Sequence, residues 1–163
     1  MSHIMSSKQN MKIDTRNTSI QNFYAGQSVF ITGGTGFLGK VLIEKLLRSC
    51  SDIKAIYLLM RSKKDKSPES RLDEMFNSIL YDRVRVEEPN FRKKIVPIMG
   101  DLEIEDLGLS KNDKDILIHN KISIIFHVAA IVRFQEKFKV PTIINVNSTD
   151  IILNIAKRMP NLK

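Results

Sequence analysis

Short apolar runs alternate with polar and amphipathic segments along most of this chain. Four of the runs are nearly uninterrupted and lie at residues 29–31, 55–60, 95–99 and 122–128. Runs of this length without a polar face are typical of parallel strands buried on both sides. Pro97 lies inside the third run and has no amide to donate, so we expect that strand where the donor is dispensable.

Residues 37–48 have helical spacing between the first two predicted strands. The apolar stripe of this helix is expected to face the sheet and holds Leu38, Val41, Leu42 and Leu46, with the stem of Lys45 extending toward solvent at its edge. Glu44 and Arg48 stand four positions apart, which predicts an ion pair on the solvent side.

Further helices follow the second, third and fourth runs. Ser67 and Pro68 are typical of a helix start. The buried positions of that helix are expected at Leu72, Met75, Phe76 and Ile79. Residues 84–94 are charged and interrupted by Pro89, which predicts a surface connection.

Two more helices are expected in the second half of the chain. Ser110 and Asp113 form a capping pattern, with Ile116 and Leu117 buried in the helix behind them. A last helix is predicted over residues 144–158, and its inward positions are Val146, Ile151, Ile155 and Ala156.

Strands that alternate with helices predict an α/β fold with a doubly wound parallel sheet of Rossmann type, about four strands wide and incomplete. Residues 1–22 are polar and without periodicity, so we predict a disordered leader there. Residues 23–163 form the predicted folded domain. In a sheet of this kind, ligands bind outside the carboxyl ends of the strands.

Composition narrows the possible partners only in part. The chain has 163 residues, a net charge of +8, 42% hydrophobic and 27% charged residues, and one cysteine, Cys50, which excludes an internal disulfide. Its Lys and Arg residues are densest at 61–66, which favours a phosphorylated small molecule over nucleic acid without excluding the latter. No run is long enough to span a membrane, no secretory signal is present, and no metal-ligand spacing occurs, so we expect a soluble piece.

Glycines punctuate the turn between the first predicted strand and its helix. Gly33, Gly36 and Gly39 stand three apart, with Thr35 among them. Glycines at such a turn let the backbone approach a pyrophosphate, and the amides at the helix start favour an anion. A dinucleotide site is therefore predicted, with an ordinary glycine-rich turn of an α/β protein as the alternative.

The tip of the second predicted strand indicates which dinucleotide binds. Arg61 follows the strand, and Lys63 and Lys64 come before the first acid, Asp65. An acidic residue there would bind the ribose of NAD, whereas an Arg accommodates the 2′-phosphate of NADP. NADPH is the predicted cofactor. His127, at the end of the fourth run, is expected to be hydrogen-bonded scaffold more than a catalytic group.

Several segments carry a resemblance to the extended short-chain dehydrogenase/reductases, and more closely to fatty acyl-CoA reductases. They read FYAGQSVFITGGTGFLGKVLIEKLLRSC, IYLLMRSKKDKSPESRL, KIVPIMGDLEIEDLGLS, IIFHVAAIVRFQEKFK and INVNSTDIILNIAKRMPNLK. The resemblance implies NADPH-dependent reduction of a fatty acyl-CoA thioester, through an aldehyde, to a primary alcohol. Ser148 departs from it, because related reductases usually carry Gly at that position.

Matching positions imply roles toward the cofactor. The pyrophosphate would lie against Thr32, Gly33, Thr35, Gly36, Phe37, Leu38 and Gly39, and the 2′-phosphate against Arg61. The adenine would border Asp101 and Leu102, and the ribose and nicotinamide side would border Ala129, Ala130 and Asn145. Arg133 and Lys137 follow in a basic loop that could meet phosphate or solvent.

No Tyr-x-x-x-Lys pair, which protonates the product in this superfamily, is present. Tyr24, Tyr57 and Tyr81 are followed four positions on by Ser28, Arg61 and Arg85. We therefore expect an amino-terminal portion that is inactive alone and lacks the acid, the acyl site and any carboxyl-terminal anchor. By resemblance, the full-length protein is expected at endoplasmic reticulum or peroxisomal membranes. Another extended reductase or epimerase, or a non-catalytic NADP-binding module, remains an alternative.

Overall fold

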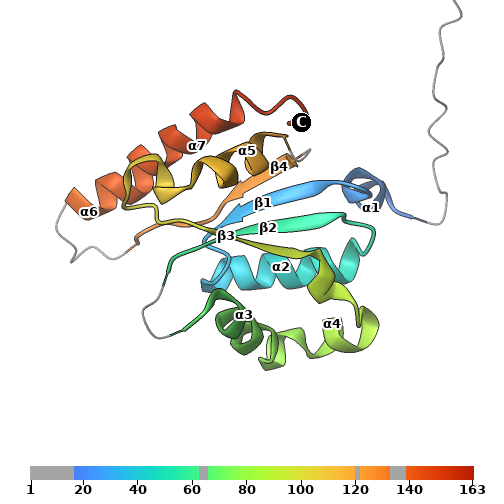
Figure 1. The fold of residues 1–163 in the computed structure, drawn as a ribbon. Coiled ribbons are helices and arrows are strands. Elements are labelled where there is room, and N and C mark those ends of the chain that lie inside the picture. The colour runs from blue at the N-terminus through green and yellow to red at the C-terminus, as the bar shows by residue number, and fades with distance from the viewer. Residues whose placement is uncertain (1–16, 63–65, 120–121, 133–138) are drawn as a thin grey trace, which may run out of the picture.

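The computed structural model describes residues 17–62, 66–119, 122–132 and 139–163. Its centre is a four-stranded parallel sheet with the strand order β3-β2-β1-β4 (Figure 1). The strands are β1 (Ser28–Thr32), β2 (Ala55–Met60), β3 (Ile95–Met99) and β4 (Ile122–His127). The predicted α/β fold with a parallel sheet is confirmed. Pro97 lies in an edge strand, as its missing amide requires.

Helices cover both faces of the sheet (Figure 1). One layer holds α2 (Phe37–Ser49), α3 (Pro68–Phe76), η1 (Ile79–Tyr81), α4 (Asp82–Glu87) and η2 (Phe91–Lys94). The other holds η3 (Glu105–Gly108), α5 (Lys111–His119), α6 (Lys139–Thr142), η4 (Ile143–Asn147) and α7 (Ser148–Ala156). Alternating residues of β1 serve the two cores, since Val29 and Ile31 pack with the first layer and Phe30 with the second.

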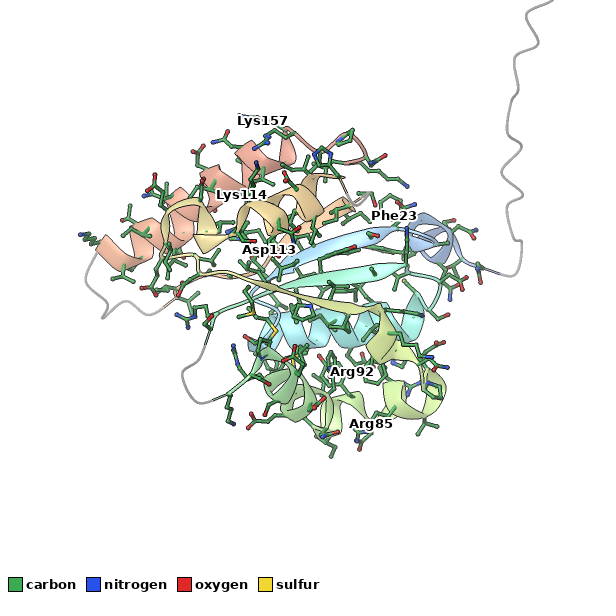
Figure 2. The ribbon with its side chains drawn as sticks, in the orientation of Figure 1. Phe23, Arg85, Arg92, Asp113, Lys114 and Lys157 are labelled. Atoms are coloured by element: carbon green, nitrogen blue, oxygen red, sulfur yellow. The ribbon has the colours of Figure 1, made fainter. Side chains whose placement is uncertain are left out.

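Charged side chains extend from both helical layers into solvent. Figure 2 shows Arg85 and Arg92 on the layer that holds α3 and α4, and Asp113, Lys114 and Lys157 on the opposite one. Several of these groups are paired, as Arg92 is with Asp73 at 2.6 Å and Lys114 with Asp106 at 2.6 Å. The positive charge of the chain is therefore spread over both layers and partly neutralised locally.

The buried face of α2 differs from the predicted one. Its buried positions are Gly39, Ile43, Glu44, Leu46 and Leu47, whereas Leu38 and Val41 of the predicted stripe are exposed. The close approach of Gly39 to the preceding loop fixes the rotation of the helix. The face of α2 that packs on the sheet is therefore shifted by about one residue from the predicted stripe.

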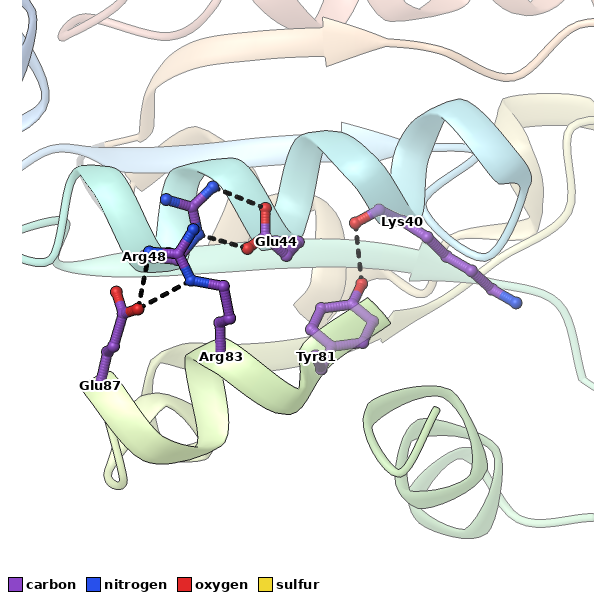
Figure 3. Close-up of polar contacts among 6 residues, drawn as sticks. All are labelled: Lys40, Glu44, Arg48, Tyr81, Arg83 and Glu87. Atoms are coloured by element: carbon purple, nitrogen blue, oxygen red, sulfur yellow. Dashed lines mark hydrogen bonds and ion pairs between the residues drawn. The ribbon is translucent and has the colours of Figure 1, made fainter. Parts of the chain in front are cut away.

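The Glu44–Arg48 ion pair forms, but the prediction that it lies on the solvent side was wrong. Glu44 is only 8% exposed, because η1 and α4 pack over this part of α2 (Figure 3). The Nε of Arg48 donates to Glu44 Oε1 at 2.5 Å. Beside it the hydroxyl of the fully buried Tyr81 donates to the carbonyl of Lys40 at 2.9 Å.

The segment after α3 contributes side chains to the first core, although its many charged residues indicated a surface connection. Residues 84–94 were predicted as a surface connection, yet they hold most of α4 and all of η2, and Val84 and Phe91 are buried in the first core. The rings of Phe76 and Phe91 meet edge to face at 5.1 Å. Ile79 was expected inside and is 87% exposed, because α3 ends at Phe76 and η1 turns the chain.

Both ends of the described chain also depart from expectation. The helix α1 (Ser19–Tyr24) lies partly inside the segment predicted to be disordered, and Thr18 caps it by accepting from the amide of Gln21. The single helix predicted over residues 144–158 is instead divided into the π-helix η4 and α7. Val146 is exposed as a result, whereas Ile144 and Ile155 are buried. Residues 1–16 lie outside the described residues.

Candidate functional site

A cleft of about 640 Å³ opens where the strands end at their carboxyl termini. Each strand contributes the segment that follows it, because parallel strands bring their carboxyl ends to one edge of the sheet. The lining residues are Gly33, Thr35, Gly36, Phe37, Leu38, Gly39, Leu59, Arg61, Arg71, Gly100, Asp101, Leu102, Glu103, Val128, Ala129, Ala130, Ile131, Val132 and Ile144.

The glycine loop after β1 forms one wall and is sterically determined. Gly33 has φ +71°, and a Cβ there would lie 2.5 Å from the amide nitrogen of Ala129. A Cβ on Gly39 would lie 2.3 Å from the carbonyl oxygen of Gly33 and 2.5 Å from Gly34 Cα. These neighbours are backbone atoms and cannot rotate away. Glycine at 33 and 39 thus lets the loop, α2 and the end of β4 meet.

The amino terminus of α2 points donors into the cleft. Gly36 is its N-cap and has no side chain to cap it, and the Lys40 amide makes the first helical hydrogen bond, to the Gly36 carbonyl at 3.0 Å. The amides of Phe37, Leu38 and Gly39 therefore have no acceptor within the helix. All three residues line the cleft. Free amides and the positive end of the helix dipole make this wall suited to an anion.

A basic corner stands at the tip of β2. Arg61 lies 3.4 Å from Glu103, measured from Nη1 to Oε1. Arg71, on α3, donates a hydrogen bond to the carbonyl of Arg61. Both arginines line the cleft, so two guanidinium groups lie where the sequence indicated one. Lys63 and Lys64, which the sequence placed in the same basic tip, lie outside the described residues.

The segment after β3 forms the next wall. The amide of Gly100 donates to the Met60 carbonyl at 3.0 Å, and the amide of Asp101 donates to the Leu107 carbonyl at 2.7 Å. The carboxylate of Asp101 accepts from the Glu103 amide at 3.0 Å. Asp106 and Leu107 have φ of 53° and 60°, a left-handed conformation uncommon outside glycine. This strained turn presents Asp101, Leu102 and Glu103 to the cleft.

The end of β4 brings small residues and a half-buried histidine to the site. Ala129 and Ala130 line the cleft, whereas His127 lies behind them. Thr32 Oγ1 and His127 Nδ1 are 2.6 Å apart, and Ser148 Oγ lies 3.4 Å from Nε2. Burial lowers the pKa of His127, so the ring is neutral at pH 7. His127 therefore joins β1, β4 and α7, in the scaffold position that the sequence favoured.

Asn145 lies outside the cleft lining and holds the loop behind it. Its amide group accepts from the Ile131 amide at 2.8 Å and donates to the Ile131 carbonyl at 2.9 Å. The π-helix η4 presents this side chain to the chain after β4. Asn145 thereby holds the backbone of Ile131, next to Ala130, and both of these residues line the cleft.

The structure thus gathers the predicted cofactor residues with two exceptions, Thr32 and Asn145, which brace the cleft from behind. Sequence reasoning missed the cleft-lining residues Leu59, Arg71, Gly100, Glu103, Val128, Ile131, Val132 and Ile144. The charge of Arg71 was visible, but only the fold brings α3 beside the tip of β2. Arg133 and Lys137 lie outside the described residues.

Within the described part of the chain, the cleft has neither a metal-binding cluster nor the cysteine. No three His, Cys, Asp or Glu side chains gather there as a metal site. Cys50 is buried away from the cleft, and burial raises the pKa of its thiol. Among residues 17–62, 66–119, 122–132 and 139–163, no helix has the length and apolarity that crossing a bilayer takes.

Comparisons with known proteins point in one direction. Residues 31–163 match the family NAD_binding_4, described as male sterility protein. Fatty acyl-CoA reductase 1 of Gallus gallus is 47% identical over 145 residues, and that of Homo sapiens is 44% identical over 145 residues. Each alignment covers 89% of this chain and 28% of the relative, so the chain spans well under half the length of these relatives.

A solved structure shares the fold. The terminal R domain of the myxalamid PKS-NRPS biosynthetic pathway superposes with a TM-score of 0.66 at 33% identity. The superposition covers 83% of this chain and 33% of that chain.

Proposed function

This chain belongs to the male sterility protein family, NAD_binding_4, and on that premise we propose that it supplies the NADPH-binding part of an alcohol-forming fatty acyl-CoA reductase. The proposal combines the cleft at the carboxyl edge of the sheet with the similarity to fatty acyl-CoA reductase 1. The single observation that carries it is the meeting of the glycine loop and two arginines on one cleft.

The cleft fits a phosphorylated dinucleotide on physical grounds. The amides at the start of α2 can donate to a pyrophosphate, and the absence of a Cβ at Gly36 leaves that approach open. Arg61 and Arg71 can donate to a 2′-phosphate, an anion that a guanidinium binds in bidentate fashion. Asp101 and Leu102 would border the adenine, and Ala129 and Ala130 the ribose and nicotinamide side.

In the proposed reaction the whole enzyme reduces a fatty acyl-CoA thioester to the aldehyde with release of CoA, and then the aldehyde to the primary alcohol. Each of the two reductions would take its hydride from a separate molecule of NADPH. The residues of this chain bind and orient: the helix amides fix the pyrophosphate and the alanines after β4 leave room for a flat ring. The proton donor of the reaction would come from sequence beyond this chain.

Membrane placement of the whole enzyme is a further part of the proposal. The resemblance to fatty acyl-CoA reductases supports an association of the full-length protein with endoplasmic reticulum or peroxisomal membranes. Imaging a fluorescent fusion of the full-length protein would test this, and a diffuse cytosolic signal would contradict it.

Calorimetric titration of the chain with NADPH and with NADH tests the cofactor assignment. We expect tighter binding of NADPH, and we expect Arg61→Met and Arg71→Met each to weaken NADPH binding by about tenfold, since each removes a charge-assisted hydrogen bond. NADH binding should change by less than about twofold.

Arg83→Met is the matched control, because Arg83 lies on α4 outside the cleft and pairs with Glu87 at 2.8 Å. Its affinity for both dinucleotides should equal that of the unaltered chain. Equal weak binding of NADPH and NADH, or a preference for NADH, would contradict the roles of Arg61 and Arg71.

A further inference from the structure

Glu103 is the acidic side chain that contacts the basic corner of the cleft. Its Oε1 lies 3.4 Å from Nη1 of Arg61, and both residues line the cleft. The pairing of β2 with β3 brings them together, because Met60 and Met99 are in register and the Gly100 amide donates to the Met60 carbonyl. The carboxylate of Asp101 holds the Glu103 amide and directs the turn toward Arg61.

This pair bears on cofactor choice. A 2′-phosphate must bind the guanidinium of Arg61, and the Glu103 carboxylate already occupies part of it. A dinucleotide without that phosphate presents a 2′-hydroxyl, which needs no guanidinium and can donate to a carboxylate. Glu103 therefore competes with the 2′-phosphate of NADPH for Arg61, whereas NADH binding meets no such competition.

We propose that Glu103 is a specificity-determining residue: its carboxylate is a counter-ion of Arg61 that a 2′-phosphate must displace, and this reduces the preference of the cleft for NADPH over NADH. The inference rests on the proposed function, since it assigns a partner to the arginine that would bind the 2′-phosphate. No other described acidic side chain is within ion-pair distance of Arg61.

Exposure sets the size of the effect. The side chains of Arg61 and Glu103 are 66% and 47% exposed, so water and salt screen their attraction. A contact of this kind can be broken by a ligand at small cost. We expect removal of the Glu103 charge to tighten NADPH binding by about two- to fivefold.

The test compares Glu103→Gln with Glu105→Gln in the 163-residue chain by titration with NADPH and NADH. Glu105 is exposed on η3 and does not line the cleft, so its variant carries the same charge change two positions away. Glu103→Gln is expected to raise the ratio of the NADH to the NADPH dissociation constant by about two- to fivefold, and Glu105→Gln to leave it unchanged. In an Arg61→Met background the effect of Glu103→Gln should fall by at least half.

The outcomes separate this inference from the proposed function. A ratio that stays the same or falls in Glu103→Gln, while the unaltered chain prefers NADPH through Arg61, overturns the inference alone. An undiminished effect in the Arg61→Met background overturns the competition for Arg61. Binding of neither dinucleotide by the unaltered chain overturns the proposed function.

Discussion

Two glycines in the same loop differ in what they contribute. Gly39 is enclosed by the backbone of Gly33 and Gly34, whereas a Cβ on Gly36 would meet only the Gly33 carbonyl oxygen, at 3.2 Å. Gly39 therefore serves the packing of α2 on the loop, and Gly36 serves the open approach to the helix amides. Both residues line the cleft, but only a Cβ on Gly39 would come within 3.0 Å of backbone atoms, so the two roles are separable.

Alanine substitution should separate these roles. Gly39→Ala is expected to cost about 1–3 kcal/mol in the free energy of unfolding, because backbone atoms must shift to admit the methyl group. Gly36→Ala should cost less, about 0.5–1 kcal/mol, because the Gly33 carbonyl oxygen need move only slightly, but it should still weaken NADPH binding, because its methyl takes up room in the cleft. Urea denaturation and calorimetric titration measure the two quantities. Equal loss of stability in both variants would contradict the division.

His127 should make the stability of the chain depend on pH. Burial lowers its pKa in the folded chain below the ordinary value of 6.5, so the unfolded chain binds more protons at this residue. The free energy of unfolding is therefore expected to fall as the pH drops below about 6.5, where the unfolded ring takes up a proton before the folded one.

Denaturation at a series of pH values checks this expectation. His127→Gln should reduce the fall in stability toward acid pH, because the titrating group is gone. His119→Gln, which removes an exposed imidazole at the end of α5, is the control for loss of a histidine. The same acid dependence in His127→Gln and in the unaltered chain would show that other groups cause it.

At the scale of elements, the buried face of α3 ends with the helix, at Phe76. Met75 is buried against α2 and the sheet, and Ile79, one helical turn later, is almost fully exposed. Met75→Ala is expected to cost about 2–5 kcal/mol, since it leaves a cavity in a packed core. Ile79→Ala should change stability by less than about 0.5 kcal/mol. A similar cost for both, measured by urea denaturation, would place Ile79 in the core after all.

Strand positions could be predicted from this sequence more reliably than helix faces. The runs at 55–60 and 95–99 coincide with β2 and β3, because strands buried on both faces tolerate few polar residues and so stand out. The face of α2 could not be predicted from its apolar stripe. Leu38 and Val41 are apolar yet exposed, while Glu44 is buried with its Arg48 partner.

The cofactor residues that could be predicted are those with a local signal in the sequence. Local signals, such as the spacing of Gly33, Gly36 and Gly39, identify a turn and its chemistry without knowledge of the rest of the fold. Arg71 and Glu103 carry no local signal. They reach the cleft only because α3 lies beside the tip of β2 and because β3 pairs with β2, which are facts of tertiary structure.

At the scale of the whole molecule, β4 is an edge strand with apolar residues along it. It pairs with β1 on one side, and on the other the described chain adds one backbone hydrogen bond, from the Lys163 amide to the Ser123 carbonyl at 3.0 Å. Ile124, Ile125 and Phe126 are only partly buried. Unpaired backbone groups beside such side chains form a template for pairing with another chain.

We therefore expect the 163-residue chain to self-associate as its concentration rises through the micromolar range. Sedimentation velocity should show an average mass that increases with concentration. Ile125→Lys should reduce this association, because a charge on an edge strand opposes pairing, whereas Ile125→Val keeps an apolar side chain and should not. A chain that stays monomeric and unfolds in one cooperative transition would mean that β4 is protected by contacts of the folded chain itself.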